Sequence, residues 1–412
     1  MKQKHIIVIP DSFKGTMTAT EVCRIIGQAI TDIAPGTHVT AIPMADGGEG
    51  TCDCFRYALG GEKVSCLAAN PFMEPRRTYY WKKDTDAVVE LAAAAGFITD
   101  PGQRNPERTT TYGVGELILH AIRGGCRRII LGLGGSCTND GGLGIAAALG
   151  ARFTDEAGRE FVPTGGTIDR IRGMDLSRLQ EQIRGVTFEV MCDVNNPLHG
   201  PQGAAFVFAP QKGADDAMVQ RLDRNLRIYA ELIQTHLGMD VSEIPGAGAA
   251  GGAGAGAVAF LGARLRPGAE IVLEMTRFDE QLASCDLVYT GEGKLDEQSL
   301  RGKVVAVIGE HASRQGVPVI AVVGQVDDGL GDGDLRDGGL GDGDLRGGDF
   351  RGGDLRDGEF MDGVLPRIRD RGITEVIQTT SFCADPARYE RTCRQDLYRA
   401  AKFAAERWVL TQ

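Results

Sequence analysis

One pattern recurs along most of the chain: a short apolar run, a loop rich in glycine and polar side chains, and then a segment with helical periodicity. Residues 6–9 read Ile-Ile-Val-Ile, and they lead into the loop 10–15 and an amphipathic segment that ends near residue 30. Further apolar runs occupy residues 39–42, 79–81, 87–91, 128–133, 186–191, 287–289 and 317–323. This alternation predicts an α/β fold with largely parallel sheets, in which ligands lie at the carboxyl ends of the strands.

The length of the chain favours two domains. A single hydrophobic core stops growing at about 250–300 residues, whereas this chain has 412. Long helical segments are expected at residues 215–237, 302–315 and 391–409. The glycine-rich segment after residue 245 is the first boundary that the pattern itself suggests.

Glycine and negative charge are both abundant. The chain contains 58 glycines, and they do not follow the three-residue period of collagen. The net charge of −11 argues against a general binder of nucleic acids or anionic membranes, since such proteins need clustered Lys and Arg. Residues 327–363 hold twelve acidic residues and four arginines, so they carry −8 of this charge. The rest of the chain is nearly neutral and can bind a small anion.

Residues 327–363 differ in pattern from the rest of the chain. A Leu or Phe recurs every five residues, usually framed as Gly-Asp-Leu-Arg. This period is similar to that of pentapeptide-repeat solenoids, but eight units make only about two coils, fewer than stable stacks usually need. The many glycines and acidic residues favour a low-complexity insertion. A partner-binding repeat remains the alternative.

Nothing in the sequence predicts a membrane protein. Residues 246–263 are uncharged, but seven of them are glycine and most others alanine, so a membrane span is not expected. The first apolar run is too short for the h-region of a signal peptide. The ten cysteines include no C-x-x-C pair, as expected for reduced thiols. We therefore expect a cytoplasmic protein that binds neither a membrane nor nucleic acid.

Two loops near the N-terminus combine glycine with charged side chains. Asp11, Ser12 and Lys14 precede a predicted helix, where free backbone N–H groups and the helix dipole favour anions. Asp46 and Glu49 lie among three glycines, and their carboxylates suit magnesium. Each string also fits an ordinary helix cap or turn.

The loop 132–142 is the most informative stretch. It reads Gly-Leu-Gly-Gly-Ser-Cys-Thr-Asn-Asp-Gly-Gly and precedes a predicted helix. Several free N–H groups and two hydroxyls in such a loop form the kind of cradle that binds polyphosphate. A glycine-rich connection without chemical function is the alternative.

Three more candidates follow predicted strands. Asp193 comes directly after the strand 186–191 and can accept a proton from a hydroxyl or hold magnesium. Lys212, a little further on, can meet a phosphate. Glu292 stands after the strand 287–289 in a loop with both acidic and basic residues. A turn or a surface loop with salt links would also explain these strings.

Several common signatures are missing from the sequence. It has no P-loop motif, no protein-kinase motif set and no G-x-S-x-G elbow. Residues 246–251 match G-x-G-x-x-G, but they follow Glu-Ile-Pro instead of a strand, so they favour dinucleotide binding only weakly.

Together these loops resemble the type 1 glycerate kinases, the family of the bacterial glycerate 2-kinases. The matching strings occur in order at residues 10–15, 44–51, 134–142, 192–198, 210–214, 245–252 and 290–298. The last fifty residues match more loosely, and the repeat at 327–363 is foreign to the family pattern.

The resemblance implies phosphorylation of D-glycerate by ATP with Mg²⁺, the 2-hydroxyl being the acceptor in this class. It also implies two α/β domains around an active-site cleft: a flavodoxin-like domain of residues 1–70 and 285–412, and an inserted domain of residues 71–284. We expect a monomer or a homodimer. A kinase for another small hydroxy acid or sugar remains an alternative, as does a nucleotide-binding scaffold.

The predicted site has four groups of residues. The catalytic residues are Asp193, Lys14 and Lys212. The residues for glycerate are Asp11, Ser12, Lys14, Asp46, Glu49 and Asn195. Those for the ATP phosphates are Gly134, Gly135, Ser136, Thr138, Asn139, Asp140, Gly141 and Glu292. The ligands for magnesium are Asp46, Asp193 and Glu292.

Overall fold

A computed structural model describes residues 3–296, 299, 303–326, 365–379 and 386–409 of the chain. The chain forms two compact units. The terminal unit comprises Met1–Pro43 and Phe278–Gln412, and the inserted unit comprises Met44–Arg277. The repeat predicted at residues 327–363 lies outside the described residues, so its structure stays a prediction.

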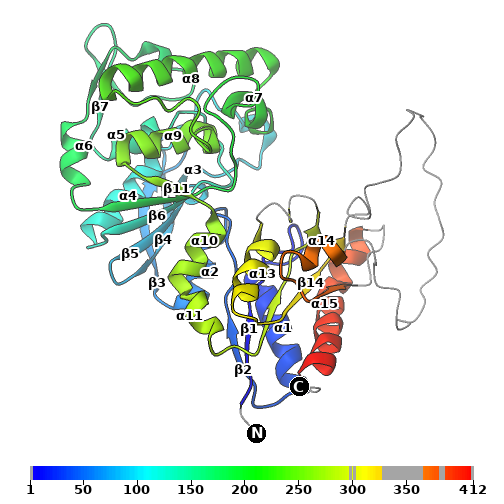
Figure 1. Ribbon diagram of the computed structural model, residues 1–412. Helices are drawn as coiled ribbons and strands as arrows, with labels where there is room; N and C mark the ends of the chain where they lie inside the picture. Colours follow the sequence, from blue (N-terminus) through cyan, green and yellow to red (C-terminus); the bar gives the residue numbers. More distant parts are fainter. Residues whose placement is uncertain (1–2, 297–298, 300–302, 327–364, 380–385, 410–412) are drawn as a thin grey trace, which may run out of the picture. The chain divides into compact units, whose positions relative to one another are not determined.

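The terminal unit is built around a five-stranded sheet whose strands come from both ends of the chain (Figure 1). The strand order is β16-β14-β12-β1-β2, and every neighbouring pair is parallel. The strands are β1 (His5–Val8), β2 (His38–Ala41), β12 (Leu287–Thr290), β14 (Val319–Val323) and β16 (Glu375–Gln378). Because all five run in one direction, their carboxyl ends lie at the same edge of the sheet.

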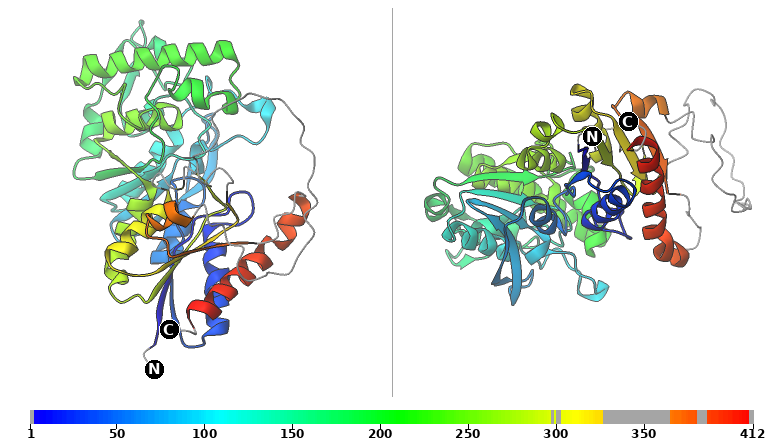
Figure 2. Two further views of the ribbon diagram at one scale, coloured as in Figure 1. Left: turned by 45° about the vertical axis from the view of Figure 1, so that its right-hand side comes forward. Right: turned by 90° about the horizontal axis from the view of Figure 1, so that it is seen from below.

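Helices cover both faces of this sheet. α1 (Ala19–Ile33) and α15 (Pro386–Trp408) lie side by side on one face, as Figure 2 shows from two directions. α13 (Val304–Arg314) packs against β12 and β14 on the opposite face. The side chains of Ile7 and Val288 point to that face and are buried. Burial on both faces explains why these strands read as continuous apolar runs. The unit also contains α11 (Phe278–Leu282), β13 (Lys294–Leu295), β15 (Gln325–Val326) and α14 (Leu365–Arg369).

The inserted unit contains a six-stranded mixed sheet in the order β11-β10-β6-β5-β4-β3. The strands from β5 to β11 are parallel, whereas β3, β4 and β5 pair antiparallel. The strands are β3 (Glu62–Ala69), β4 (Pro75–Lys83), β5 (Asp86–Glu90), β6 (Arg128–Gly132), β10 (Thr187–Met191) and β11 (Arg264–Arg266). Two of the candidate loops of this unit follow β6 and β10, which are adjacent parallel strands.

Helices and a second small sheet complete the inserted unit. The small sheet is antiparallel and consists of β8 (Glu160–Phe161), β7 (Arg152–Thr154) and β9 (Gly173–Asp175). The helices are α2 (Thr51–Leu59), α3 (Ala92–Ala95), α4 (Tyr112–Arg123), α5 (Leu143–Ala148), α6 (Ser177–Gln182), α7 (Ala204–Phe208), α8 (Asp216–Leu237), α9 (Ala249–Leu261) and α10 (Gly268–Thr276). Three 3₁₀ turns are η1 (Pro101–Gln103), η2 (Ile168–Arg170) and η3 (Pro210–Lys212).

The boundaries between the units lie at residues 43/44 and 277/278, not at the expected 70/71 and 284/285. Residues 44–70 belong to the inserted unit because they pack within it. The thiol of Cys52 donates to the carbonyl of Val88 (3.3 Å), and the rings of Phe55 and Trp81 are 5.5 Å apart. The whole length of β3 then pairs with β4.

The α/β class with parallel sheets and flanking helices is confirmed. Among the described residues, no helix combines the length and the apolar character that crossing a membrane requires. Nine of the ten cysteines lie in the described part of the chain, and each is a free thiol.

Candidate functional site

Two loops of the terminal unit meet at the carboxyl ends of β1 and β12. The backbone N–H of Asp11 donates to the carbonyl of Gly291 over 2.8 Å. The two loops are in close contact, since a Cβ on Gly293 would lie 3.1 Å from the Cα of Phe13. This backbone contact brings Glu292 beside Asp11, as adjacent parallel strands predict.

The loop after β1 does not cap α1. Thr18 is the N-cap: its hydroxyl accepts from the N–H of Glu21 (3.2 Å), and the Glu21 carboxylate accepts from the N–H of Thr18 (2.9 Å). Asp11 Oδ1 accepts instead from the N–H of Ser12 (2.6 Å), and Lys14 is exposed. The reading of Asp11 or Ser12 as an ordinary helix cap is therefore wrong. Both stay candidates for contact with a ligand.

Glu292 is a buried carboxyl group at the end of β12. Its side chain is 5% exposed, and Oε1 has no hydrogen-bond partner among the described residues. Burial is the main cause that raises its pKa to about 7; the hydrogen bond with Ser299 and the charge of Lys303 oppose this shift, and the carboxylates of Asp11 and Asp296 add to it. A carboxyl group that titrates near neutrality at the end of a parallel strand is typical of a functional site.

In the inserted unit, the loops 46–51 and 132–142 pack against each other through their backbones. The N–H of Gly134 donates to the carbonyl of Gly47 over 2.9 Å. A Cβ on Gly134 would lie 2.5 Å from the Cα of Gly48, and one on Gly132 would lie 2.4 Å from the carbonyl oxygen of Gly47. Only glycine permits this approach. Two of the predicted loops therefore form one structure.

Asp46 and Glu49 are exposed on this paired structure. Asp46 Oδ1 accepts from the N–H of Gly48 (2.9 Å), which is an Asx turn. The following helix, α2, receives its cap from the end of β5: the buried Glu90 accepts from the N–H of Cys52 (2.6 Å). Because Glu90 satisfies this N–H group, the helix does not need Asp46 or Glu49 as a cap.

Gly268, the first residue of α10, joins Asp46 to Asp193. Its N–H donates to Asp193 Oδ1 (2.8 Å), and a Cβ on Gly268 would lie 3.2 Å from the Cα of Asp46. Asp193 is exposed, as is Asn195 two residues further on. Gly268 therefore contacts both the carboxylate of Asp193 and the backbone of Asp46, near the end of β10. Nothing in the local sequence marks Gly268, because a lone Pro-Gly pair signals only a turn.

Asp140 faces the interior of the unit. It is fully buried, and its carboxylate accepts hydrogen bonds from the N–H and hydroxyl of Thr111, the hydroxyl of Thr110, and the N–H groups of Gly142 and Gly144. Burial raises the pKa of Asp140, whereas these hydrogen bonds oppose the shift. The predicted contact with phosphate does not fit this arrangement, because contact would require breaking an internal network. Asp140 shapes the loop.

The rest of the glycine-rich loop is divided between surface and interior. Gly135 is exposed and Gly134 half-buried, whereas Ser136, Thr138 and Asn139 are buried. The Thr138 hydroxyl and both amide atoms of Asn139 have no hydrogen-bond partner among the described residues. The part of the loop that reaches the surface is therefore Gly134–Gly135, with Ser136 at its inner end.

The environment of Lys212 also differs from the one that the sequence predicts. The sequence predicts a lysine that touches the transferred phosphate, but Lys212 is 2% exposed in η3. Its Nζ donates to the hydroxyl oxygen of Ser136 and to the carbonyl oxygen of Thr138, both at 2.7 Å. Burial lowers its pKa to about 8, while the thiol of Cys137 and the carboxylate of Asp140 act in the opposite direction. The ammonium group is committed to the loop.

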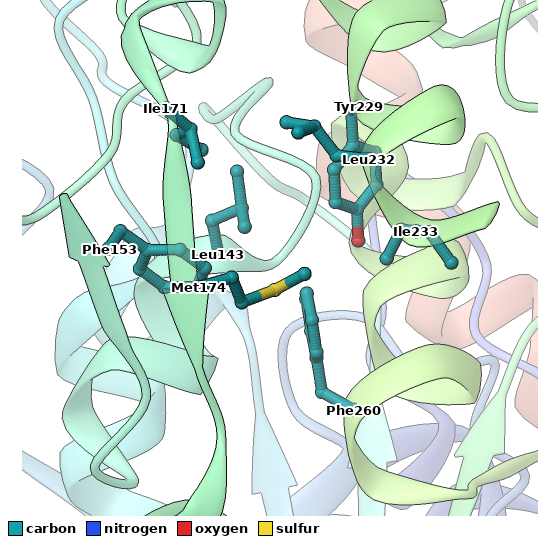
Figure 3. A pocket seen from close by; sticks show the side chains of 8 residues that line it. All are labelled: Leu143, Phe153, Ile171, Met174, Tyr229, Leu232, Ile233 and Phe260. Atoms are coloured by element: carbon teal, nitrogen blue, oxygen red, sulfur yellow. The ribbon is translucent and has the colours of Figure 1, made fainter. Parts of the chain in front are cut away.

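An apolar cavity lies behind the same loop (Figure 3). Tyr229 forms part of its wall, and its hydroxyl donates to the carbonyl of Gly141 (2.8 Å). The N–H of Gly141 in turn donates to the carbonyl of Gly251 (3.0 Å), so the G-x-G-x-x-G string packs against this loop. The cavity lining carries no charged side chain, so it does not provide a phosphate site. It is formed by Leu143, Phe153, Ile171, Met174, Tyr229, Leu232, Ile233 and Phe260.

The predicted magnesium ligands fall into two groups. Asp46 and Asp193 both lie next to Gly268 in the inserted unit, whereas Glu292 belongs to the terminal unit. In the part of the chain that the structure describes, no three His, Cys, Asp or Glu side chains are arranged to hold a metal ion. Magnesium in phosphoryl-transfer sites usually takes one or two carboxylates together with substrate phosphates and water. The pair Asp46 and Asp193 fits that requirement.

Comparison with known proteins gives one consistent result. The model of the glycerate kinase family matches residues 6–339. A glycerate kinase of Bacillus cereus is 45% identical over 324 residues, which cover 78% of this chain and 85% of that protein. The glycerate 2-kinase of Escherichia coli K12 is 42% identical over 330 residues, or 79% and 86% of the two chains. A crystal structure assigned as glycerate kinase 2 of Salmonella typhimurium LT2 superposes with a TM-score of 0.82 at 34% identity and covers 100% of both chains.

The parallel sheets, the polar loops at their carboxyl ends and these matches define an enzyme of the kinase class. More specifically, the chain belongs to the glycerate kinase family. The family resemblance expected from the seven strings is thus confirmed, and all seven lie within the matched residues.

Proposed function

We propose that this enzyme transfers the γ-phosphoryl group of ATP to the 2-hydroxyl of D-glycerate and releases ADP and 2-phosphoglycerate. The observation that carries the proposal is the match to the Escherichia coli protein named glycerate 2-kinase, since 79% of this chain aligns with 86% of that one. The polar loops at the carboxyl ends of β1, β6, β10 and β12 support it, because phosphoryl transfer depends on positioning and charge neutralisation more than on covalent catalysis.

In the inserted unit, we assign the ATP phosphates to the surface part of the glycine-rich loop. The backbone N–H groups of Gly134 and Gly135 and the hydroxyl of Ser136 are the donors that this part of the loop can offer. Thr138, Asn139, Asp140 and Gly141 would act behind them by holding the loop, since all four are buried.

Asp193 is our candidate for the proton acceptor. In the proposed step, the 2-hydroxyl oxygen of glycerate forms a bond to the γ-phosphorus, the bond from that phosphorus to the bridging oxygen of ADP breaks, and the hydroxyl proton passes to the Asp193 carboxylate. The hydrogen bond from Gly268 holds this carboxylate in place. Asn195, exposed nearby, would help to orient the substrate hydroxyls.

In the terminal unit, Ser12 and Lys14 are our candidates for the glycerate carboxylate. An exposed ammonium next to a hydroxyl suits a carboxylate, and Asp11 orders the same loop through its bond to the N–H of Ser12. Glu292 contributes an oxygen beside Asp11, Oε1, that has no hydrogen-bond partner within the described residues, and it suits a hydrogen bond to a ligand hydroxyl.

Magnesium would be held by Asp46 and Asp193, with Glu49 close to Asp46 in sequence. Bound there, it would neutralise charge on the phosphates. We further propose that the enzyme is cytoplasmic and acts as a monomer or homodimer.

The decisive experiment identifies the product. The purified chain is incubated with D-glycerate, ATP and Mg²⁺, and phosphorus and carbon NMR then locate the new phosphate ester. A resonance of 2-phosphoglycerate is expected. A product phosphorylated at the 3-hydroxyl would overturn the assigned position.

The substrate class needs a separate assay. ADP release is measured with D-glycerate, lactate, tartronate and simple sugars at equal concentrations. The highest kcat/KM is expected for D-glycerate. Turnover of a sugar without turnover of glycerate would instead favour a related kinase on the same scaffold.

A further inference from the structure

Lys212 occupies an unusual position for a lysine. Among the described residues it is the only lysine in the buried class. It lies in η3, between α7 and α8, and the loop it contacts follows β6. A buried ammonium requires hydrogen-bond acceptors, because an unpaired charge in the interior is strongly unfavourable. Both acceptors that Lys212 uses belong to the glycine-rich loop.

These two hydrogen bonds bridge the loop on either side of Cys137. One acceptor is the hydroxyl oxygen of Ser136, and the other is the carbonyl oxygen of Thr138. The side chains of Thr138 and Asn139 make no hydrogen bond with the described residues. Lys212 therefore supplies two of the side-chain hydrogen bonds that hold this stretch. The hydroxyl of Thr109, which donates to the carbonyl of Cys137 (3.1 Å), and the backbone bond from Cys137 to Ala95 (3.0 Å) supplement them.

A buried carboxylate fixes the other end of the loop. Asp140 accepts five hydrogen bonds and so joins the loop to Thr110 and Thr111 before α4 and to the first turn of α5. In the described structure Lys212 donates to Ser136 and Thr138, and its charge and that of Asp140 attract each other. The buried ammonium of Lys212 thus holds one end of the loop, and the buried carboxylate of Asp140 holds the other. Gly134 and Gly135 precede the part held by Lys212 and are the more exposed residues.

We propose that Lys212 is a positioning residue: it sets the conformation in which Ser136 and the N–H groups of Gly134 and Gly135 meet the ATP phosphates, and it acts through Ser136 instead of touching the transferred phosphoryl group. This inference rests on the proposed binding of ATP by the loop. The positioning role predicts energetic coupling between Lys212 and Ser136. A direct contact of the Lys212 ammonium with phosphate would not produce this coupling.

The protonation state of Lys212 separates the two roles. A neutral amine keeps two N–H donors, which is enough for both acceptors, whereas a charge acting on phosphate disappears when the proton leaves. The groups facing the ammonium are Asp140, buried and hydrogen-bonded, and the Cys137 thiol, whose pKa burial raises to about 12. The pKa of Lys212 is about 8 and that of Glu292 is about 7, so the pH profile of kcat/KM for ATP between pH 7 and 9 should have the same shape in wild type and in Lys212→Met. A fall through pH 8 that is absent in Lys212→Met would overturn the proposal.

A double-mutant cycle provides the main test. Lys212→Met, Ser136→Ala and the double variant are compared with wild type for kcat, KM for ATP, and ATP affinity by calorimetry. Each single substitution should lower kcat/KM for ATP by roughly 10- to 100-fold, the loss typical of a buried hydrogen bond to a charged group. The double variant should lose little more than the worse single variant. Lys83→Met is the matched control, because it removes an exposed lysine of the same unit whose Nζ also donates to a carbonyl, that of Leu59.

The outcomes are distinguishable. Additive losses, or a Lys212→Met variant with wild-type kinetics, would overturn the positioning role. If Lys212→Met does not fold, Ser136→Ala decides: unchanged ATP affinity in that variant would show that Lys212 has no effect through Ser136. If wild type binds ATP but does not phosphorylate glycerate, the proposed acceptor fails, and the calorimetric cycle still tests the inference.

Discussion

The backbone N–H of Gly268 donates a hydrogen bond of 2.8 Å to the carboxylate of Asp193. The donor is the first residue of α10, so Asp193 satisfies one of the unpaired N–H groups at the start of this helix. A catalytic carboxylate must be held in one orientation to accept a proton from a bound hydroxyl. The same bond therefore satisfies the start of α10 and also orients the Asp193 carboxylate for proton acceptance. A substitution can separate these two functions.

Asp193→Asn should abolish proton acceptance by this side chain but keep its hydrogen bond with Gly268 at the start of α10. The amide oxygen of Asn still accepts from Gly268, but the side chain has no basic oxygen. We expect kcat to fall by about 10²- to 10⁴-fold and the KM for ATP to change far less, because Asp46 would still hold the magnesium. Steady-state kinetics with saturating D-glycerate measure both values.

Asp175→Asn is the control for this substitution. Asp175 is an exposed aspartate of the same unit that also accepts from a backbone N–H, that of Ser177 (3.0 Å). Its replacement should leave kcat unchanged. An unchanged kcat in Asp193→Asn would remove Asp193 from the mechanism.

The sequence predicts four of the five strands of the terminal sheet, because burial on both faces leaves a simple pattern in strands such as β1 and β14, but it misses β16. β1 and β14 are almost wholly apolar, so their positions follow directly from the residues. β3 was not predicted, since Glu62–Ala69 mixes charged, polar and apolar residues at the edge of a sheet. The boundary at residues 43/44 has no compositional signal, because it depends on contacts between Gly47 and Gly132 that are distant in sequence.

The site loops could be found from the sequence, but the direction of their side chains could not. Asp140 and Asp193 both follow strands in polar loops, yet one is fully buried and the other exposed. The difference arises because Thr110 and Thr111 reach Asp140 from a distant part of the chain. The three consecutive threonines before α4 were the available signal. Their hydroxyls had no evident partner in the local sequence.

Gly134→Ala should disrupt the contact between the two glycine-rich loops. The added Cβ would lie 2.5 Å from the Cα and 2.8 Å from the N of Gly48, and backbone atoms cannot avoid it by changing rotamer. We expect a loss of about 1–3 kcal/mol in the free energy of unfolding. A loop displaced by about 1 Å should also lower kcat/KM for ATP on the order of 10- to 100-fold.

Gly27→Ala is the matched control in α1. A Cβ there would meet only Val39 Cγ1 at 3.6 Å, an ordinary contact, so this helix should gain up to about 1 kcal/mol. Urea-induced unfolding gives the free energy of unfolding of Gly134→Ala and Gly27→Ala, and steady-state kinetics give their kcat/KM for ATP. Equal stability of Gly134→Ala and wild type would show that the loops do not need their close contact.

Asp140→Asn should destabilise the inserted unit without removing a group that touches ligand. The NH₂ group of an Asn would replace either Oδ1, which accepts from Gly142, or Oδ2, which accepts the other four bonds, so at least one of the five hydrogen bonds should be lost. We expect a loss of about 2–4 kcal/mol in the free energy of unfolding. Kinetics at a temperature where the variant stays folded should show a raised KM for ATP. A variant as stable as wild type would contradict the structural role.

Deletion of residues 327–363 tests whether the insertion takes part in turnover. The candidate residues all lie between Asp11 and Glu292, before the deleted segment. Replacing the segment by a short Gly-Ser linker should therefore leave kcat and both KM values within about twofold, while the net charge changes from −11 to −3. A linker of the same length as the segment controls for chain connectivity. Loss of turnover in the short-linker variant alone would indicate a spacing requirement, and loss in both would favour a functional repeat.

The pH dependence of stability should reveal the burial of Lys212. Its pKa is about 8 in the folded protein against 10.5 for an ordinary lysine, so between these pH values the unfolded chain binds more protons than the folded one. The free energy of unfolding of wild type, measured relative to Lys212→Met, should therefore rise with pH from about 8 to 10.5, by at most about 1.4 kcal/mol per pH unit. Below pH 8 the difference should be constant. Lys83→Met corrects for the loss of one charge, and a difference without any pH dependence would mean that Lys212 keeps its ordinary pKa in the folded protein.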